Sequence, residues 1–168
     1  MKSLTLLICA LVAAFCPANI TLGQELFLNG KDITLGGVSC KIWEAAIPTS
    51  TTKPLFIFSH HFHGNNAKYD YLFSAMAKLG FVVVAPNHAD AVFEGSKAKP
   101  EDAPEVAWAT PELWAPETFK ARCNDIRAVL RGLDYDAELS GRIDFSRVIL
   151  GGHSLGGYTA LSMAGAQD

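Results

Sequence analysis

The sequence predicts an α/β fold in which helices cover both faces of a mostly parallel β-sheet. Two short apolar runs, LFIF at 55–58 and FVVVA at 81–85, are typical of strands buried on both faces. The segment between them, 67–80, places apolar residues at helical spacing and ends at Gly80. A strand, a helix and a second strand in this order need a crossover connection, so the two strands should be parallel.

The segments on either side extend this pattern. Residues 25–45 contain two strand-like runs separated by glycines, which predicts a half-buried hairpin or meander. Residues 117–136 are expected to form an amphipathic helix with Arg122 off its apolar face. A buried strand at 148–150 is then followed by a turn and a helix that begins near Ser154. The later strands should therefore extend one sheet.

Composition fits one globular domain and excludes one class of partner. The chain has 168 residues, of which 49% are hydrophobic and 18% are charged. Its formal net charge is −3 and it contains no block of like charges. A nucleic-acid partner is therefore not expected.

The N-terminus has the three parts of a secretory signal peptide. Lys2 precedes an apolar run at 4–15, and Pro17 with small or polar residues follows. The run is too short to cross a bilayer core of about 30 Å. We therefore predict that residues 1–23 are a signal peptide, that the protein is secreted (extracellular or periplasmic), and that no stable membrane span remains. An uncleaved anchor or a buried helix is the alternative.

Signal removal would take Cys9 and Cys16 away and leave Cys40 and Cys123. In an oxidising compartment these two thiols either pair or stay free, since two cysteines do not make a disulfide framework. A second open choice concerns the proline-rich segment 87–116. Its tryptophans, Trp108 and Trp114, belong either to a lid or substrate-side loop or to a surface excursion that they anchor.

The segment GGHSLGGYTAL at 151–161 has the Gly-x-Ser-x-Gly pattern of a nucleophile elbow. A sharp strand-to-helix turn strains the central residue and crowds the backbone, so Gly152 and Gly156 must be small. Ser154 would then stand clear of the sheet as a nucleophile, and the N–H group of Leu155 would donate to the oxyanion. The alternative is a serine that only caps the helix.

Two motifs in order carry a family resemblance. The loop SHHFHG at 59–64 follows a buried strand, and the elbow follows a later one. Together they resemble the secreted α/β hydrolases of the dienelactone hydrolase, platelet-activating-factor acetylhydrolase and chlorophyllase-like group. The resemblance implies that residues 24–168 are the N-terminal part of one α/β-hydrolase domain, incomplete at the C-terminus. It also implies a serine hydrolase that cleaves a carboxylic ester, lactone or related acyl bond of a small molecule.

In that group the first loop reads roughly Ser-His-Gly-x-Gly-Gly, and the residue after the first glycine donates its N–H group to the oxyanion. The resemblance therefore implies that Phe62 is the second oxyanion donor. This chain departs from the group at two positions, because His61 and His63 stand where the group has glycines.

The sequence also predicts roles for the other histidines and whether a cofactor is needed. Histidines 61 and 63 invite a metal site, but no acidic or cysteine partner clusters nearby, so none is expected. We expect His60 to orient the loop by hydrogen bonding, His153 to be structural, and His88 to belong to the loop wall. No cofactor is expected, because no phosphate-binding glycine loop is present.

The triad acid and histidine are missing from the visible sequence. In this fold they follow the nucleophile in chain order, yet only 14 residues follow Ser154. We expect both beyond Asp168, so this chain alone should lack activity. The alternatives are a non-catalytic secreted binding protein on a hydrolase scaffold, and a peptidase of the same fold.

Overall fold

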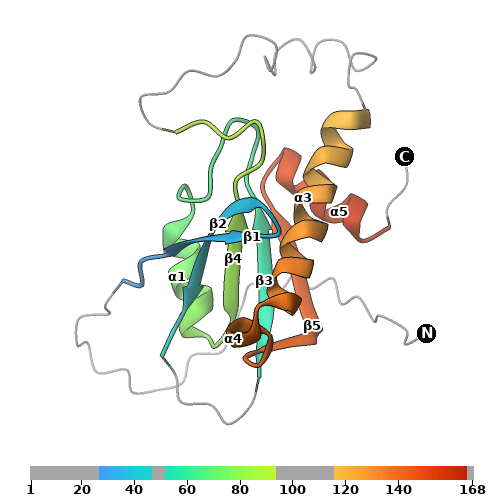
Figure 1. Cartoon of the computed structure of the whole chain (residues 1–168). Helices are drawn as coiled ribbons and strands as arrows, with labels where there is room; N and C mark the ends of the chain where they lie inside the picture. The colour runs from blue at the N-terminus through green and yellow to red at the C-terminus, as the bar shows by residue number, and fades with distance from the viewer. Residues whose placement is uncertain (1–26, 47–51, 94–115, 166–168) are drawn as a thin grey trace.

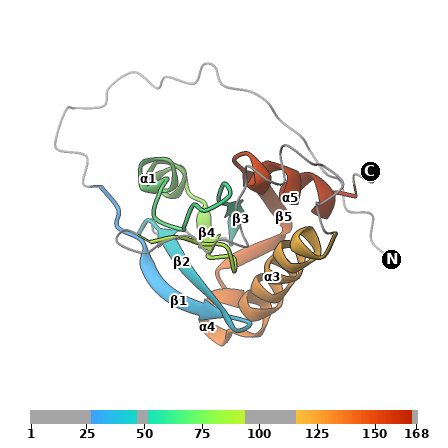
Figure 2. The same cartoon turned by 90° about the horizontal axis from the view of Figure 1, so that it is seen from above.

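The structure confirms the predicted α/β fold. The computed structural model describes residues 27–46, 52–93 and 116–165, in which five strands form one sheet with helices on both of its faces (Figures 1 and 2). The predicted signal peptide at 1–23 and the tryptophans Trp108 and Trp114 lie outside the described residues.

The sheet is mostly parallel, with the strand order β1-β2-β4-β3-β5. Strand β2 is antiparallel to both of its neighbours, and β3 is parallel to both β4 and β5. Four of the five described strands therefore run in the same direction. In chain order the strands are β1 (Lys31–Leu35), β2 (Val38–Glu44), β3 (Lys53–Ser59), β4 (Val82–Pro86) and β5 (Ile143–Gly152).

The helices form two layers around this sheet (Figure 2). On one face α1 packs against β2 and β4, and on the other α3 and α5 pack against the sheet and each other. None of the described helices is long and apolar enough to cross a bilayer. The helices are α1 (Asp70–Lys78), α3 (Pro116–Tyr135), the single turn α4 (Ala137–Ser140) and α5 (Leu155–Met163).

Strand β3 shows why the apolar runs predicted strands so well. Leu55 and Ile57 belong to the apolar cluster under α3, whereas Phe56 and Phe58 belong to the cluster under α1. Successive side chains of a strand point to opposite faces, so a strand covered on both faces needs apolar residues at every position. Burial of each such side chain contributes about 1.5–3 kcal/mol relative to leaving it in water.

Two predicted boundaries were wrong. The helix predicted over 67–80 begins only at Asp70, because the Asn65 side chain accepts the N–H group of Ala67 in a turn before it. The strand predicted at 148–150 begins already at Ile143, with a register shift opposite the Pro54–Leu55 step of β3.

The two cysteines of the described region are both free and buried. The Cys40 thiol donates to the Val38 carbonyl oxygen over 3.4 Å, and burial raises its pKa to about 12. Because the thiolate is the reactive form, Cys40 behaves as a small apolar core residue.

Candidate active site

Ser154 lies in the turn between β5 and α5, at the edge where the parallel strands end. Its φ is 54° and its ψ is −121°, a conformation that residues other than glycine rarely adopt. The residue is exposed, and although it is the N-cap of α5, its side chain makes no capping hydrogen bond. A strained, exposed serine at a helix start has the geometry of a nucleophile elbow rather than of a helix cap.

The two elbow glycines lie where a side chain has no room. A Cβ atom on Gly156 would lie 2.5 Å from the carbonyl carbon of Ser59 and 2.7 Å from the carbonyl oxygen of His60. A Cβ atom on Gly152 would lie 2.6 Å from the backbone nitrogen of Gly157. Backbone atoms cannot rotate away as a side chain can, so both positions require glycine.

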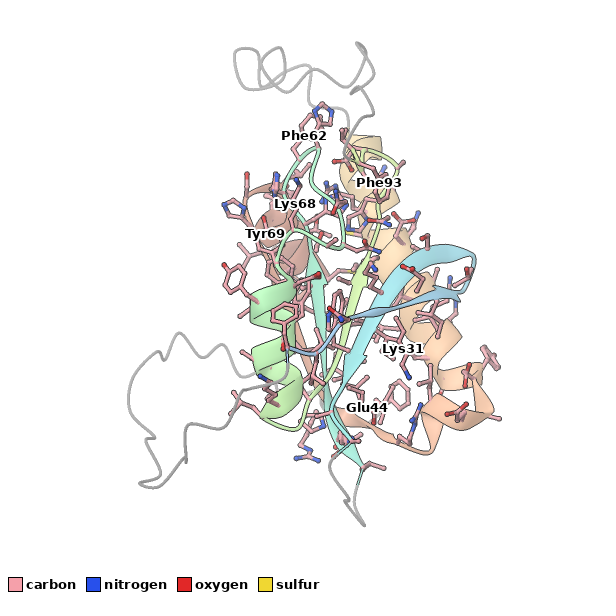
Figure 3. All side chains as sticks on the ribbon, turned by 90° about the vertical axis from the view of Figure 1, so that its left-hand side faces the viewer. Lys31, Glu44, Phe62, Lys68, Tyr69 and Phe93 are labelled. Carbon is pink, nitrogen blue, oxygen red and sulfur yellow. The ribbon has the colours of Figure 1, made fainter. Side chains whose placement is uncertain are left out.

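The 59–64 loop leaves β3 directly beside the elbow. Ser59 pairs with Gly152 in the sheet, and the N–H group of His153 donates to the carbonyl oxygen of Ser59 over 3.2 Å. Gly64 N–H donates to the carbonyl oxygen of His61 over 2.9 Å, which closes a turn around Phe62. Figure 3 shows Phe62 at the end of the sheet opposite Glu44.

The backbone of this turn explains how the chain accommodates one histidine in a glycine position. His63 has φ 54°, so it occupies the left-handed region that glycine adopts most easily. Within the described residues, the N–H groups of Phe62 and Leu155 donate to no backbone acceptor. Neither N–H group is therefore paired with a backbone group within this part of the chain, as an oxyanion donor requires.

A tyrosine joins the loop to the elbow on the side of α1. The Tyr69 hydroxyl lies 2.5 Å from His61 Nδ1 and 2.7 Å from His153 Nδ1. The rings of the two histidines also contact each other edge to face, with centroids 5.4 Å apart. His153 is therefore hydrogen-bonded to Tyr69 and anchors the elbow.

Behind the loop lies a buried hydrogen-bond chain that the sequence did not predict. Ser59 Oγ lies 2.8 Å from His88 Nε2, and His88 Nδ1 lies 2.8 Å from Asp125 Oδ2. Arg122 Nη1 also donates to Ser59 Oγ over 3.2 Å. Ser59 is only 2% exposed and His88 only 3%, so this serine and this histidine are both closed off from a substrate.

His60 completes this buried region and orients the loop. Its Nε2 accepts the N–H group of His88 over 3.1 Å, so its Nδ1 carries the proton and donates to the carbonyl oxygen of His61 over 2.7 Å. Both ring nitrogens are thus bonded to backbone groups, one in the turn and one at His88 after β4. The His60 ring therefore holds the loop in position through these two hydrogen bonds.

Burial dominates the protonation states of these groups. It lowers the pKa of His60 to about 4 and also lowers the pKa of His88, so both rings are neutral near pH 7. Burial alone would raise the pKa of Asp90, but the hydrogen bond and charge of Arg122 outweigh it and hold that pKa below its usual value. The His61 pKa is lowered by burial and then by the His153 charge.

Two expectations from the sequence need correction here. Arg122, expected off the apolar face of its helix, is 1% exposed and points to Ser59, His60 and Asp90. His88, expected in a loop wall, is also buried and lies at the centre of the hydrogen-bond chain from Ser59 to Asp125. Only the position of His88 just after a buried strand hinted at a role near the sheet edge, and no pattern marked Arg122.

The described residues offer no ready-made cation site. Among them, no three histidine, cysteine, aspartate or glutamate side chains lie close enough together to hold a metal ion. His61 Nδ1 faces the Tyr69 hydroxyl, and the His63 N–H group donates to Asp90 Oδ2 over 3.1 Å.

Comparison with known proteins finds a curated protein of similar sequence. Platelet-activating factor acetylhydrolase of Cavia porcellus is 27% identical to this chain over an aligned region of 170 positions, gaps included. The aligned region covers 84% of this chain and 39% of that protein. The chain thus spans about two fifths of the length of this curated relative.

Solved structures show the same fold. The dienelactone hydrolase-like promiscuous phosphotriesterase P91 from metagenomic libraries superimposes with a TM-score of 0.56 at 17% identity, covering 82% of this chain and 54% of its own. The ferulic acid esterase of Streptomyces cinnamoneus gives a TM-score of 0.55 at 18% identity. The superposition covers 76% of this chain and 47% of the esterase chain. The fold is therefore the α/β-hydrolase fold.

The family follows from a match that covers most of the chain. The sequence profile of chlorophyllase matches residues 45–167, which include the 59–64 loop, the buried chain behind it and the elbow. The resemblance to the dienelactone hydrolase, acetylhydrolase and chlorophyllase-like group is confirmed. This chain belongs to the chlorophyllase family of α/β hydrolases.

Proposed function

We propose that this chain is the nucleophile-bearing part of a secreted serine hydrolase that cleaves a carboxylic ester, lactone or related acyl bond. The observation that carries the proposal is the strained and exposed conformation of Ser154, with no capping bond, directly beside a loop whose Phe62 N–H group has no backbone acceptor among the described residues. Ser154 attacks the substrate carbonyl carbon, and the N–H groups of Phe62 and Leu155 bind the oxyanion that forms.

The general base and the acid lie outside the described residues in this proposal. His153 is bonded to Tyr69, and His88 is bonded to Ser59 and Asp125, so neither is placed to take a proton from Ser154. The relatives extend well beyond the length that this chain spans. A serine without a base is a weak nucleophile, so the 168-residue chain alone is expected to be inactive.

The name of the curated relative favours an ester over a peptide, whereas two of the solved structures with this fold are acylaminoacyl peptidases. The curated relative is named an acetylhydrolase, and one of the structural neighbours is a ferulic acid esterase. Acyl transfer from an ester uses the same serine and the same oxyanion donors as acyl transfer from a peptide. Peptidase activity is therefore the second candidate, and matched ester and amide substrates distinguish the two.

An active-site serine probe tests the proposal. The complete translation product of the gene should be labelled by a fluorophosphonate at Ser154 and should hydrolyse p-nitrophenyl acetate, whereas Ser154→Ala should do neither. Ser162→Ala, two turns further along α5, is the matched control and should behave as wild type. A complete product that binds an ester analogue but is never labelled would support the non-catalytic binding protein instead.

The secretion part has its own measurement. We propose that residues 1–23 are removed during export to an extracellular or periplasmic location. The protein recovered from that compartment should have a mass that lacks this segment, and a full-length mass in the cytosol alone would contradict the proposal.

A further inference from the structure

An ion pair lies buried directly behind the loop that carries Phe62. Arg122 of α3 bonds Asp90 through both arms of its guanidinium, Nε to Oδ1 over 3.1 Å and Nη2 to Oδ2 over 2.6 Å. Such a two-armed pair fixes orientation as well as distance. Burial of the two charges is costly, so the direction of their remaining bonds indicates what the pair does.

Those remaining bonds reach the backbone on both sides of Phe62. Arg122 Nη1 donates to the carbonyl oxygen of His60 over 2.8 Å, two residues before the donor. Asp90 Oδ2 accepts the N–H group of His63 over 3.1 Å, one residue after it. The pair therefore joins the start and the end of the turn.

The bond at His63 has a particular consequence, because this residue is held at φ 54°. A left-handed conformation is unfavourable for a residue with a side chain and persists only where its surroundings enforce it. A charge-assisted bond from a fixed carboxylate supplies such enforcement. This bond orients the peptide between Phe62 and His63, and the bond from Arg122 orients the peptide that follows His60. The peptide that carries the Phe62 N–H group lies between these two fixed peptides.

The hydrogen-bond chain through Ser59 fixes the same arginine from the other side. A guanidinium only donates, so Ser59 Oγ accepts from Arg122 and gives its own proton to His88 Nε2. His88 Nδ1 then carries the proton that bonds Asp125. Each donor in this hydrogen-bond chain has a defined acceptor, so the guanidinium of Arg122 is held in a single orientation.

We propose that Arg122 is a positioning residue of the oxyanion hole: through Asp90 and the His60 carbonyl oxygen it sets the direction of the Phe62 N–H group. The catalytic part of this inference rests on the proposed function, whereas the structural part does not.

Amide hydrogen exchange tests the structural part on the chain itself. Arg122→Lys keeps the charge but loses the planar fork, so exchange at the His63 amide should accelerate at least about tenfold relative to the Val83 amide in the core. Asp90→Asn, which preserves shape, should have the same effect and serves where the arginine variant does not fold. An unchanged exchange ratio in either variant overturns the proposal.

A matched control separates positioning from general destabilisation. Lys53 is 8% exposed and bonds Glu44 over 2.8 Å at the opposite end of β3. Lys53→Met also removes a buried ion pair, but it should leave the His63 to Val83 exchange ratio unchanged. A ratio that rises as much in Lys53→Met as in Arg122→Lys also overturns the proposal.

The catalytic part is measured on the complete translation product with p-nitrophenyl acetate. Arg122→Lys should lower kcat by about 100-fold, the usual effect of a misdirected oxyanion donor, while KM stays close to the wild-type value. Unchanged kcat in an active enzyme overturns the catalytic part of the inference. Absence of hydrolysis in the wild type overturns the proposed function instead, and the exchange ratio still decides the structural part.

Discussion

Two adjacent glycines of α5 provide a stringent test of the elbow geometry. A Cβ atom on Gly156 would lie 2.5 Å from the Ser59 carbonyl carbon, whereas on Gly157 the nearest atom, the carbonyl oxygen of Gly152, would be 3.4 Å away. The first distance is far below a van der Waals contact and the second is close to an ordinary one. Gly156→Ala and Gly157→Ala therefore make the same chemical change, one with a collision and one without.

The expected magnitudes follow from this contrast. Replacing glycine by alanine inside a helix stabilises it by up to about 1 kcal/mol, and both variants gain this. Forcing a methyl group into a packed site typically costs about 1–3 kcal/mol, and the upper end applies where the obstacle is backbone. We expect Gly156→Ala to be destabilised by about 2 kcal/mol and Gly157→Ala to be neutral or stabilised by up to about 1 kcal/mol.

Urea unfolding at pH 7, followed by tryptophan fluorescence, measures the difference. Trp43 is 1% exposed, so its emission should shift when the sheet unfolds. The midpoint should fall for Gly156→Ala and should hold or rise for Gly157→Ala, with similar slopes. Free energies of unfolding that agree within about 0.5 kcal/mol would refute the reasoning, since they would mean that no close approach exists at the first site.

Two further predictions concern buried titratable groups. Unfolded histidines bind protons near pH 6.5, but burial lowers the pKa of His60 to about 4 and lowers that of His88. The unfolded state thus binds more protons, so stability is complete above pH 6.5 and decreases towards pH 4, by up to about 3 kcal/mol from His60. The urea midpoint should fall as the pH decreases over that range, and it should fall less steeply in His60→Gln than in the wild type. Equal slopes of midpoint against pH in the two proteins would contradict this. Cys40 should react with Ellman's reagent at pH 8 only after unfolding, because burial raises its pKa to about 12; rapid reaction in the native state would argue otherwise.

The fold was predictable because its signals are local. An apolar run such as 55–58 predicts a strand covered on both faces without knowledge of its partners. The start of β5 was missed for the opposite reason, since residues 144–147 are mostly polar and their strand state depends on pairing with distant β3. The turn before α1 was missed because a single side chain, Asn65, decides where the helix begins.

The candidate site was predictable only where backbone geometry demands a residue type. The elbow glycines are required by close approach, and the pattern around Ser154 therefore shows in the sequence. Arg122 has no such local mark, because its partners Ser59 and His60 lie more than 60 residues away along the chain. An arginine on an amphipathic helix is usually solvated, and only the tertiary structure shows that this one is buried.

Ser59 connects the two halves of the site through one backbone group. Its carbonyl oxygen accepts the N–H group of His153 on the elbow. Its carbonyl carbon lies against Gly156, whose lack of a side chain lets α5 approach it closely. Its side chain is held by His88 and Arg122, the residue that also binds the loop. A displacement of Ser59 would therefore move the proposed nucleophile, Ser154, and the proposed oxyanion donor, Phe62, together. It follows that their relative geometry is set within this part of the chain, whichever residues supply the general base.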